Sequence, residues 1–162
     1  MTYKKTTMDR LEGCTNIITK KELMRYTNRV IISGSKSNGF NLSYEFFNNY
    51  LLELFEEDIK DKTQIVFMTA LETTGAECFI IKFCRENNLA ICPFEMNWED
   101  KNGKFDKTSY YKRNEEMMVY ATRLISFYDG SSKGQQQLLE LAESTKLKRN
   151  IIRISKEENL NG

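Results

Sequence analysis

The sequence contains no histidine among its 162 residues. Catalytic arrangements that depend on an imidazole, such as Ser-His-Asp and Cys-His sites, are therefore excluded, and so is a zinc ion bound by histidine. Any chemistry that this chain performs has to use carboxylates, lysine, tyrosine, serine, cysteine or the bound ligand itself.

Cysteine is also sparse, and its spacing does not suit a metal site. The four cysteines stand at positions 14, 78, 84 and 92, and none belongs to a C-x-x-C pair. Cys78, Cys84 and Cys92 lie within strongly apolar segments. Because zinc sites take closely spaced ligands from fixed turns, we expect buried, reduced thiols here and neither a metal nor another cofactor.

Long apolar runs and an excess of one charge are absent as well. The 24 basic and 23 acidic residues give a net charge of +1. No apolar run approaches the roughly 20 residues that cross a bilayer, and the N-terminus lacks the apolar core of a signal peptide. We therefore expect a cytoplasmic protein without a membrane partner, and the near-neutral charge does not favour a nucleic acid as partner.

Short apolar, β-branched runs alternate with helical patterns along the chain. Strands are predicted at 30–32, 65–68, 89–94, 124–128 and 150–154. Helical patterns occupy 43–55, 76–87, 110–120 and 135–144. This alternation predicts the α/β class: a Rossmann-like three-layer fold with a mostly parallel sheet of about five or more strands.

The organised pattern defines one domain over residues 29–162, preceded by an N-terminal extension over residues 1–28. In the extension, Thr19 and Glu22 have the spacing of a capping box before a short helix at 20–26. The extension fits an edge element, an oligomer arm or a lid, and the sequence does not choose among these.

Glycine-rich loops follow several predicted strands. In open α/β sheets, ligands bind beyond the carboxyl ends of the strands. Four loops lie there: Gly34–Gly39, Thr69–Gly75, Asn97-Trp98 with the residues that follow, and Asp129–Gly134. A glycine loop that enters a helix offers free N–H groups and a positive helix end to a phosphate, and Lys36 or Lys133 adds charge. None of these loops is a P-loop, and plain turns remain the alternative interpretation.

Two further features have both a structural and a functional interpretation. Arg113 and Asn114 open a helix, where they form either an ordinary charged helix start or a pair that contacts a phosphate and a ribose or base edge. The single tryptophan, Trp98, either packs against the sheet or stacks on a base.

In order along the chain, these motifs resemble the SLOG superfamily, and more narrowly its YspA-type (DUF2493-like) branch, from about residue 29 to residue 154. The resemblance implies a nucleotide-derived ligand bound at the carboxyl edge of the sheet. The ligand-binding residues expected from the loops and the resemblance are Gly34, Ser35, Lys36, Thr74, Gly75, Glu77, Trp98, Arg113, Asn114, Asp129, Gly130, Ser131, Ser132, Lys133, Gly134 and Gln135.

Departures from the family pattern bear on catalysis. Leu71 and Glu72 replace two glycines of the second loop, and Leu138 stands where related phosphoribohydrolases carry a catalytic glutamate. We therefore expect a binding protein that senses or sequesters a signal. The resemblance further implies a homo-oligomer and a setting such as phage counter-defence. The alternative is a nucleoside or nucleotide N-glycosidase, or a ribosyl-transferring enzyme, that uses Glu72 or Glu77. DNA binding is a third hypothesis, because a DNA-processing protein uses the same superfamily core.

Overall fold

The fold is built on one parallel sheet. The computed structural model describes residues 3–35, 42–71, 75–97, 99 and 101–153. Its five strands are hydrogen-bonded in the order β3-β2-β1-β4-β5, and every neighbouring pair is parallel. The strands are β1 (Asn28–Gly34), β2 (Ile65–Thr69), β3 (Ala90–Pro93), β4 (Arg123–Tyr128) and β5 (Lys148–Arg153).

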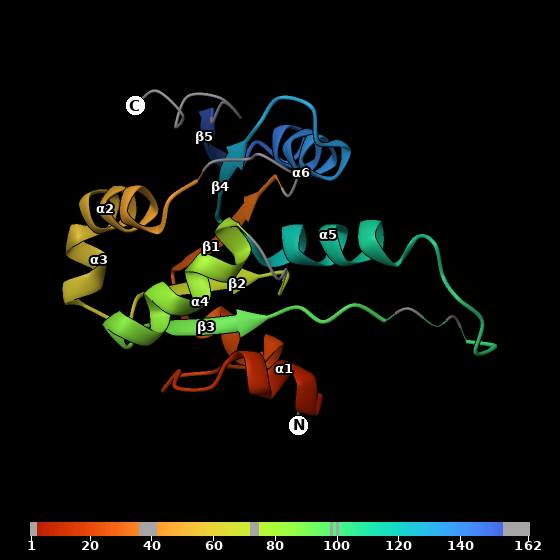
Figure 1. The fold of residues 1–162 in the computed structure, drawn as a ribbon, viewed down its shortest axis with the longest axis horizontal. Coiled ribbons are helices and arrows are strands. Elements are labelled where there is room, and N and C mark those ends of the chain that lie inside the picture. Colours follow the sequence, from red (N-terminus) through yellow and green to blue (C-terminus); the bar gives the residue numbers. More distant parts are fainter. Residues whose placement is uncertain (1–2, 36–41, 72–74, 98, 100, 154–162) are drawn as a thin grey trace.

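Helices cover both faces of this sheet (Figure 1). The helices are α1 (Lys5–Arg10), the 3-10 helix η1 (Lys20–Arg25), α2 (Tyr44–Leu54), α3 (Glu56–Lys60), α4 (Ala76–Asn87), α5 (Ser109–Tyr120) and α6 (Lys133–Ser144). Buried residues of α2 and α4 share one core cluster, and those of α5 and α6 share the other. This confirms the predicted Rossmann-like α/β class, since the sheet lies between two helical layers.

Side chains of each strand alternate between the two cores. In β1, Val30 and Ile32 belong to the cluster under α2 and α4, whereas Ile31 belongs to the cluster under α5 and α6. All five residues of β2 are buried. Strands buried on both faces need apolar residues at successive positions, which explains why they appeared in the sequence as continuous apolar runs.

Capping residues set the ends of the helices that flank the site. The Ser43 hydroxyl accepts a hydrogen bond from the Phe46 N–H at 3.1 Å at the start of α2. Gly75, with a φ of 74°, precedes α4, and Asn88 in the left-handed conformation ends it. The predicted span 76–87 therefore matches α4 residue for residue.

The N-terminal extension packs along the outer edge of β3. The Ile18 N–H donates to the Ile91 carbonyl at 2.9 Å, and the Ile91 N–H donates to the Asn16 carbonyl at 3.0 Å. Leu11 is fully buried in the cluster under α2 and α4, and Leu23 is fully buried in the cluster on the opposite face. The described part of the extension is thus an edge element that passes from one face of the sheet to the other.

The short helix predicted in the extension is present as η1. The Glu22 carboxylate accepts hydrogen bonds from the Thr19 N–H at 2.9 Å and from its hydroxyl at 3.1 Å, as the capping-box spacing indicated. Two short helices, α1 and α3, were not predicted. Within the described ranges, none of the helices combines the length and apolarity that a membrane crossing requires.

Adjacent phenylalanines of α2 provide a test of this packing. Phe47 is fully buried against Phe83 and Phe127, whereas Phe46 is 46% exposed. We expect Phe47→Ala to lower the free energy of unfolding by about 3–5 kcal/mol, because it leaves a cavity in the core. Phe46→Ala, the matched control, should cost less than about 1 kcal/mol. Chemical denaturation measures both values, and equal losses would contradict the assigned face of α2.

Candidate functional site

The candidate site lies where the strand order reverses. β1 and β4 are neighbours in the sheet, but the chain continues from β1 to α2 on one face and from β4 to α6 on the other (Figure 1). In open α/β sheets this topology leaves a crevice beyond the carboxyl ends of the two strands. The loops after β1 and β4, which carry many of the predicted ligand-binding residues, both begin at this crevice.

The loop after β2 reaches the same place. A side-chain carbon at Gly34 would lie 2.9 Å from the Ala76 Cβ and 3.2 Å from the Phe127 carbonyl oxygen. One at Gly75 would lie 3.3 Å from the Ser35 carbonyl oxygen. The ends of β1 and β4 and the start of α4 therefore approach so closely that glycine is favoured at position 34.

Hydrogen bonds join the loops after β1 and β4. The Ser35 hydroxyl, itself 1% exposed, accepts a hydrogen bond from the Asp129 N–H at 3.0 Å. The Asp129 carboxylate in turn accepts from the N–H groups of Ser131 at 2.9 Å and Ser132 at 3.1 Å. Gly130 permits this tight turn with a φ of 94°. These bonds fix the backbone just before α6.

Two helices, α4 and α6, begin at this edge of the sheet. The residue before α4 is Gly75, which has no side chain with which to cap the helix. The residue before α6 is Ser132, whose side chain makes no capping hydrogen bond. Neither N-cap residue therefore caps its helix with a side chain, and the positive end of each helix attracts an anion.

Gln135 anchors the first turn of α6 to the sheet. Its side-chain carbonyl oxygen accepts hydrogen bonds from the hydroxyls of Ser33 at 2.7 Å and Ser126 at 3.0 Å. These serines are register partners in β1 and β4, and all three side chains are buried. Gln135 was predicted to bind ligand, and that role stays a prediction. In this structure its carbonyl oxygen is occupied by the two serines.

Arg113 connects α5 to the neighbouring loops. It is 4% exposed, and its Nη1 donates to the Ala70 carbonyl at 3.3 Å, at the end of β2. Its guanidinium lies 4.7 Å from the centre of the Tyr110 ring. A side-chain carbon at Gly134 would lie 2.7 Å from the Cζ atom of that ring, so α5 and α6 start side by side.

Asn114 and Glu77 are also buried at this edge. The Asn114 side-chain amide donates to the Gln137 side chain at 2.7 Å, which joins α5 to α6. Glu77, in the first turn of α4, is 3% exposed, and its backbone carbonyl accepts from the Thr69 hydroxyl at 3.1 Å. The predicted residues Lys36, Glu72, Thr74 and Trp98 lie outside the described residues.

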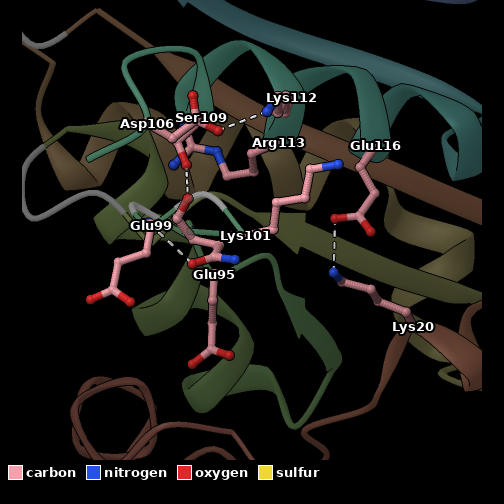
Figure 2. A pocket seen from close by; sticks show the side chains of 10 residues that line it. Lys20, Glu95, Glu99, Lys101, Asp106, Ser109, Lys112, Arg113 and Glu116 are labelled. Atoms are coloured by element: carbon pink, nitrogen blue, oxygen red, sulfur yellow. Dashed lines mark hydrogen bonds and ion pairs between the residues drawn. The ribbon is translucent and has the colours of Figure 1, made fainter. Parts of the chain in front are cut away.

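A cavity of about 640 Å³ opens beside Arg113 on the β3 side of the sheet (Figure 2). Its lining comprises Lys20, Glu95, Asn97, Glu99, Lys101, Asp106, Ser109, Lys112, Arg113 and Glu116. Arg113 belongs both to this lining and to the set of predicted ligand-binding residues. In Figure 2 it lies between the Asp106–Lys112 pair and the Lys20–Glu116 pair.

Charges in the cavity lining are balanced, with four basic and four acidic residues. Lys20 pairs with Glu116 at 2.8 Å, and Lys112 pairs with Asp106 at 2.7 Å. The hydrogen bond from Lys112, followed by those from Thr108, lowers the pKa of Asp106 to about 2, so this carboxylate stays charged at neutral pH. The cavity lining therefore contains both cationic hydrogen-bond donors and anionic acceptors.

Sequence reasoning did not identify most of this lining. Many of the residues come from the polar connection between β3 and α5, which has no hydrophobic periodicity. Its length was the available signal, because a connection of this size at the carboxyl edge of a sheet is frequently functional.

The cysteines are free thiols. Cys84 and Cys92 are buried, as predicted, whereas Cys14 and Cys78 are half-buried. Burial raises the pKa of the Cys92 thiol to about 12. In the described part of the chain, no three Cys, Asp or Glu side chains are grouped so that they would hold a metal ion.

Comparisons with known proteins give a distant likeness. No family model matches the chain, and no curated protein matches it. A similar solved structure is DNA processing protein A from Helicobacter pylori, which was studied for its single-stranded DNA binding mode. The two chains share 14% sequence identity with a TM-score of 0.49, over 88% of this chain and 75% of the other. A likeness at this level carries no argument about function.

The contact between Gly134 and Tyr110 tests whether α5 and α6 meet as described. We expect Gly134→Ala to lower the free energy of unfolding by about 1–3 kcal/mol, because the added carbon overlaps the tyrosine ring. In the Tyr110→Ala background the same change should cost much less. Thermal and chemical denaturation of the four proteins in this double-mutant cycle measure the coupling. Additive effects would show that the two residues do not touch.

Proposed function

We propose that this protein binds a phosphorylated, nucleotide-derived small molecule in the crevice between the ends of β1 and β4. The observation that carries the proposal is the contact of three loops there. Gly34 at the end of β1, Ser35 after it, Gly75 after β2 and Asp129 after β4 are linked by close approach or by hydrogen bonds. Loops from separate parts of the chain thus meet at one edge.

The chemistry of this edge suits a phosphate. The N-cap residues of α4 and α6, Gly75 and Ser132, make no side-chain cap, so the positive ends of both helices attract an anion. Lys133, the first residue of α6, is exposed and adds a positive charge. A phosphate would thus receive backbone hydrogen bonds and one ammonium group.

The size and charge of the neighbouring cavity favour a small molecule over a nucleic-acid strand. Its volume of about 640 Å³ lies within the range of about 300–1,000 Å³ typical of small-molecule sites. A nucleic-acid surface needs many cations along the phosphate backbone, whereas this lining carries as many carboxylates as cations. Arg113 lines the cavity and donates to the Ala70 carbonyl at the end of β2. In this proposal one ligand places its phosphate at the crevice and extends its sugar and base toward the cavity.

The resemblance to the YspA-type branch of the SLOG superfamily, which rests on the order of the motifs along the sequence, extends this proposal. On that basis the protein senses or sequesters a nucleotide signal without turning it over, in the cytoplasm and as a homo-oligomer. A phage counter-defence role is one setting in which such sequestration is useful.

Catalysis is the second candidate function. Glu77 lies buried in the first turn of α4, next to the proposed crevice, and is the described carboxylate that a glycosidase of this kind would use. Incubation of the protein with NAD, ADP-ribose and cyclic nucleotides, followed by mass spectrometry of the products, distinguishes binding from catalysis. If the wild-type protein releases a free base and the Glu77→Gln variant does not, the function is N-glycosidic cleavage and not binding alone.

Isothermal titration against NAD, ADP-ribose and cyclic nucleotides tests binding directly. We expect at least one of these compounds to bind at one site per chain. Lys133→Ala should weaken that binding by about two- to fivefold, the usual effect of one solvent-exposed ion pair. Lys146→Ala removes an exposed charge after the far end of α6 and should leave the affinity unchanged. Uniform absence of heat across the panel would contradict the proposal.

A further inference from the structure

Helix α1 touches the carboxyl edge of the sheet in two places. At its start, the Lys4 N–H and the Thr7 hydroxyl donate to the Glu95 carboxylate at 2.9 Å and 2.5 Å, just after β3. At its end, the Arg10 guanidinium donates to the Leu71 carbonyl, just after β2. A segment more than 60 residues away in sequence thus contacts the exits of two strands.

Leu71 has an unusual backbone conformation. Its φ is 62°, in the left-handed region that non-glycine residues seldom adopt, and its side chain is 6% exposed. The Leu71 N–H donates to the Thr69 hydroxyl at 3.1 Å. Such a conformation is unfavourable by itself and persists where surrounding contacts hold it in place.

Two arginines from different helices donate to consecutive carbonyls of this segment. Arg113 of α5 donates to the Ala70 carbonyl at 3.3 Å, and Arg10 of α1 donates to the Leu71 carbonyl. Ala70 and Leu71, the first residues after β2, are therefore held by these two side chains. Four residues further on, Gly75 lies against Ser35 and precedes α4.

Contacts on both sides of Arg10 keep α1 in place. Leu11 is fully buried in the core under α2 and α4, and Thr7 is 5% exposed. Arg10 itself is exposed, so its removal takes away the hydrogen bond to Leu71 without opening the core. This separation makes its role testable.

We propose that Arg10 is a positioning residue for the loop after β2, and that the N-terminal extension thereby sets the geometry of the ligand site. The proposal rests on the proposed function for its ligand, whereas the restraint on the loop is independent of it. The proposed effect of α1 on ligand affinity is indirect: Arg10 positions the loop after β2, and α1 itself does not contact the ligand.

Two measurements on the full chain test this inference. The first is amide hydrogen exchange at Leu71 and Phe79, which we expect to become about three- to tenfold faster in Arg10→Ala because a hydrogen bond to a charged group is lost. The second is the affinity for ADP-ribose, which should fall by a similar factor. Arg10→Lys, which keeps a donor, should recover part of both effects.

Arg25→Ala is the matched control, because Arg25 is an exposed arginine of η1 that pairs with Glu22 at 3.5 Å, away from the β2 loop. Equal exchange in Arg10→Ala and Arg25→Ala would overturn the inference. So would equal affinity of the two variants for ADP-ribose, which would leave the proposed function intact. Faster exchange in Arg10→Ala, in a protein that binds none of the nucleotides, would support the restraint and refute the proposed function.

Discussion

The buried hydrogen bonds of Gln135 join β1 and β4 to α6, the helix whose first turn borders the candidate site. Ser33 and Ser126 face each other across β1 and β4, and each would be costly to bury without a partner. One amide oxygen from α6 satisfies both hydroxyls. Because these bonds are shielded from water, the first turn of α6 is held over the point where the strand order reverses.

The remaining loops are arranged around that fixed point. Ser35 follows β1 directly and hydrogen-bonds to Asp129, which in turn orders the backbone that leads into α6. Gly75 brings α4 against Ser35, and Tyr110 brings α5 against Gly134. Backbone N–H groups are thus concentrated at one edge of the sheet, and Arg113 lines a cavity of about 640 Å³ on the β3 side.

The strongly periodic parts of the sequence predicted their structure well. The helix at 76–87 has apolar residues such as Ile80 and Phe83 on one face, a glycine before it and Asn88 after it, so its limits were readable. By contrast, α1 buries Thr7 within its own span and α3 buries no residue, and neither leaves a hydrophobic pattern. Their positions depend on tertiary contacts such as those of Glu95.

The site was predictable in part for the same reason. The rule that ligands bind at the carboxyl ends of strands brought the loops at Gly34, Gly75 and Asp129 together, and the structure places them in contact. The cavity and the Arg10–Leu71 contact were not predictable, because they depend on how a long polar connection and the N-terminal extension pack. Amide chemical-shift mapping with ADP-ribose is the decisive test of a ligand site shared by the three loops. We expect the N–H signals of Ser35, Gly75, Ser131 and Gly134 to shift together at one saturation point. Shifts confined to one loop, or no shifts at all, would show that the loops do not form a common site.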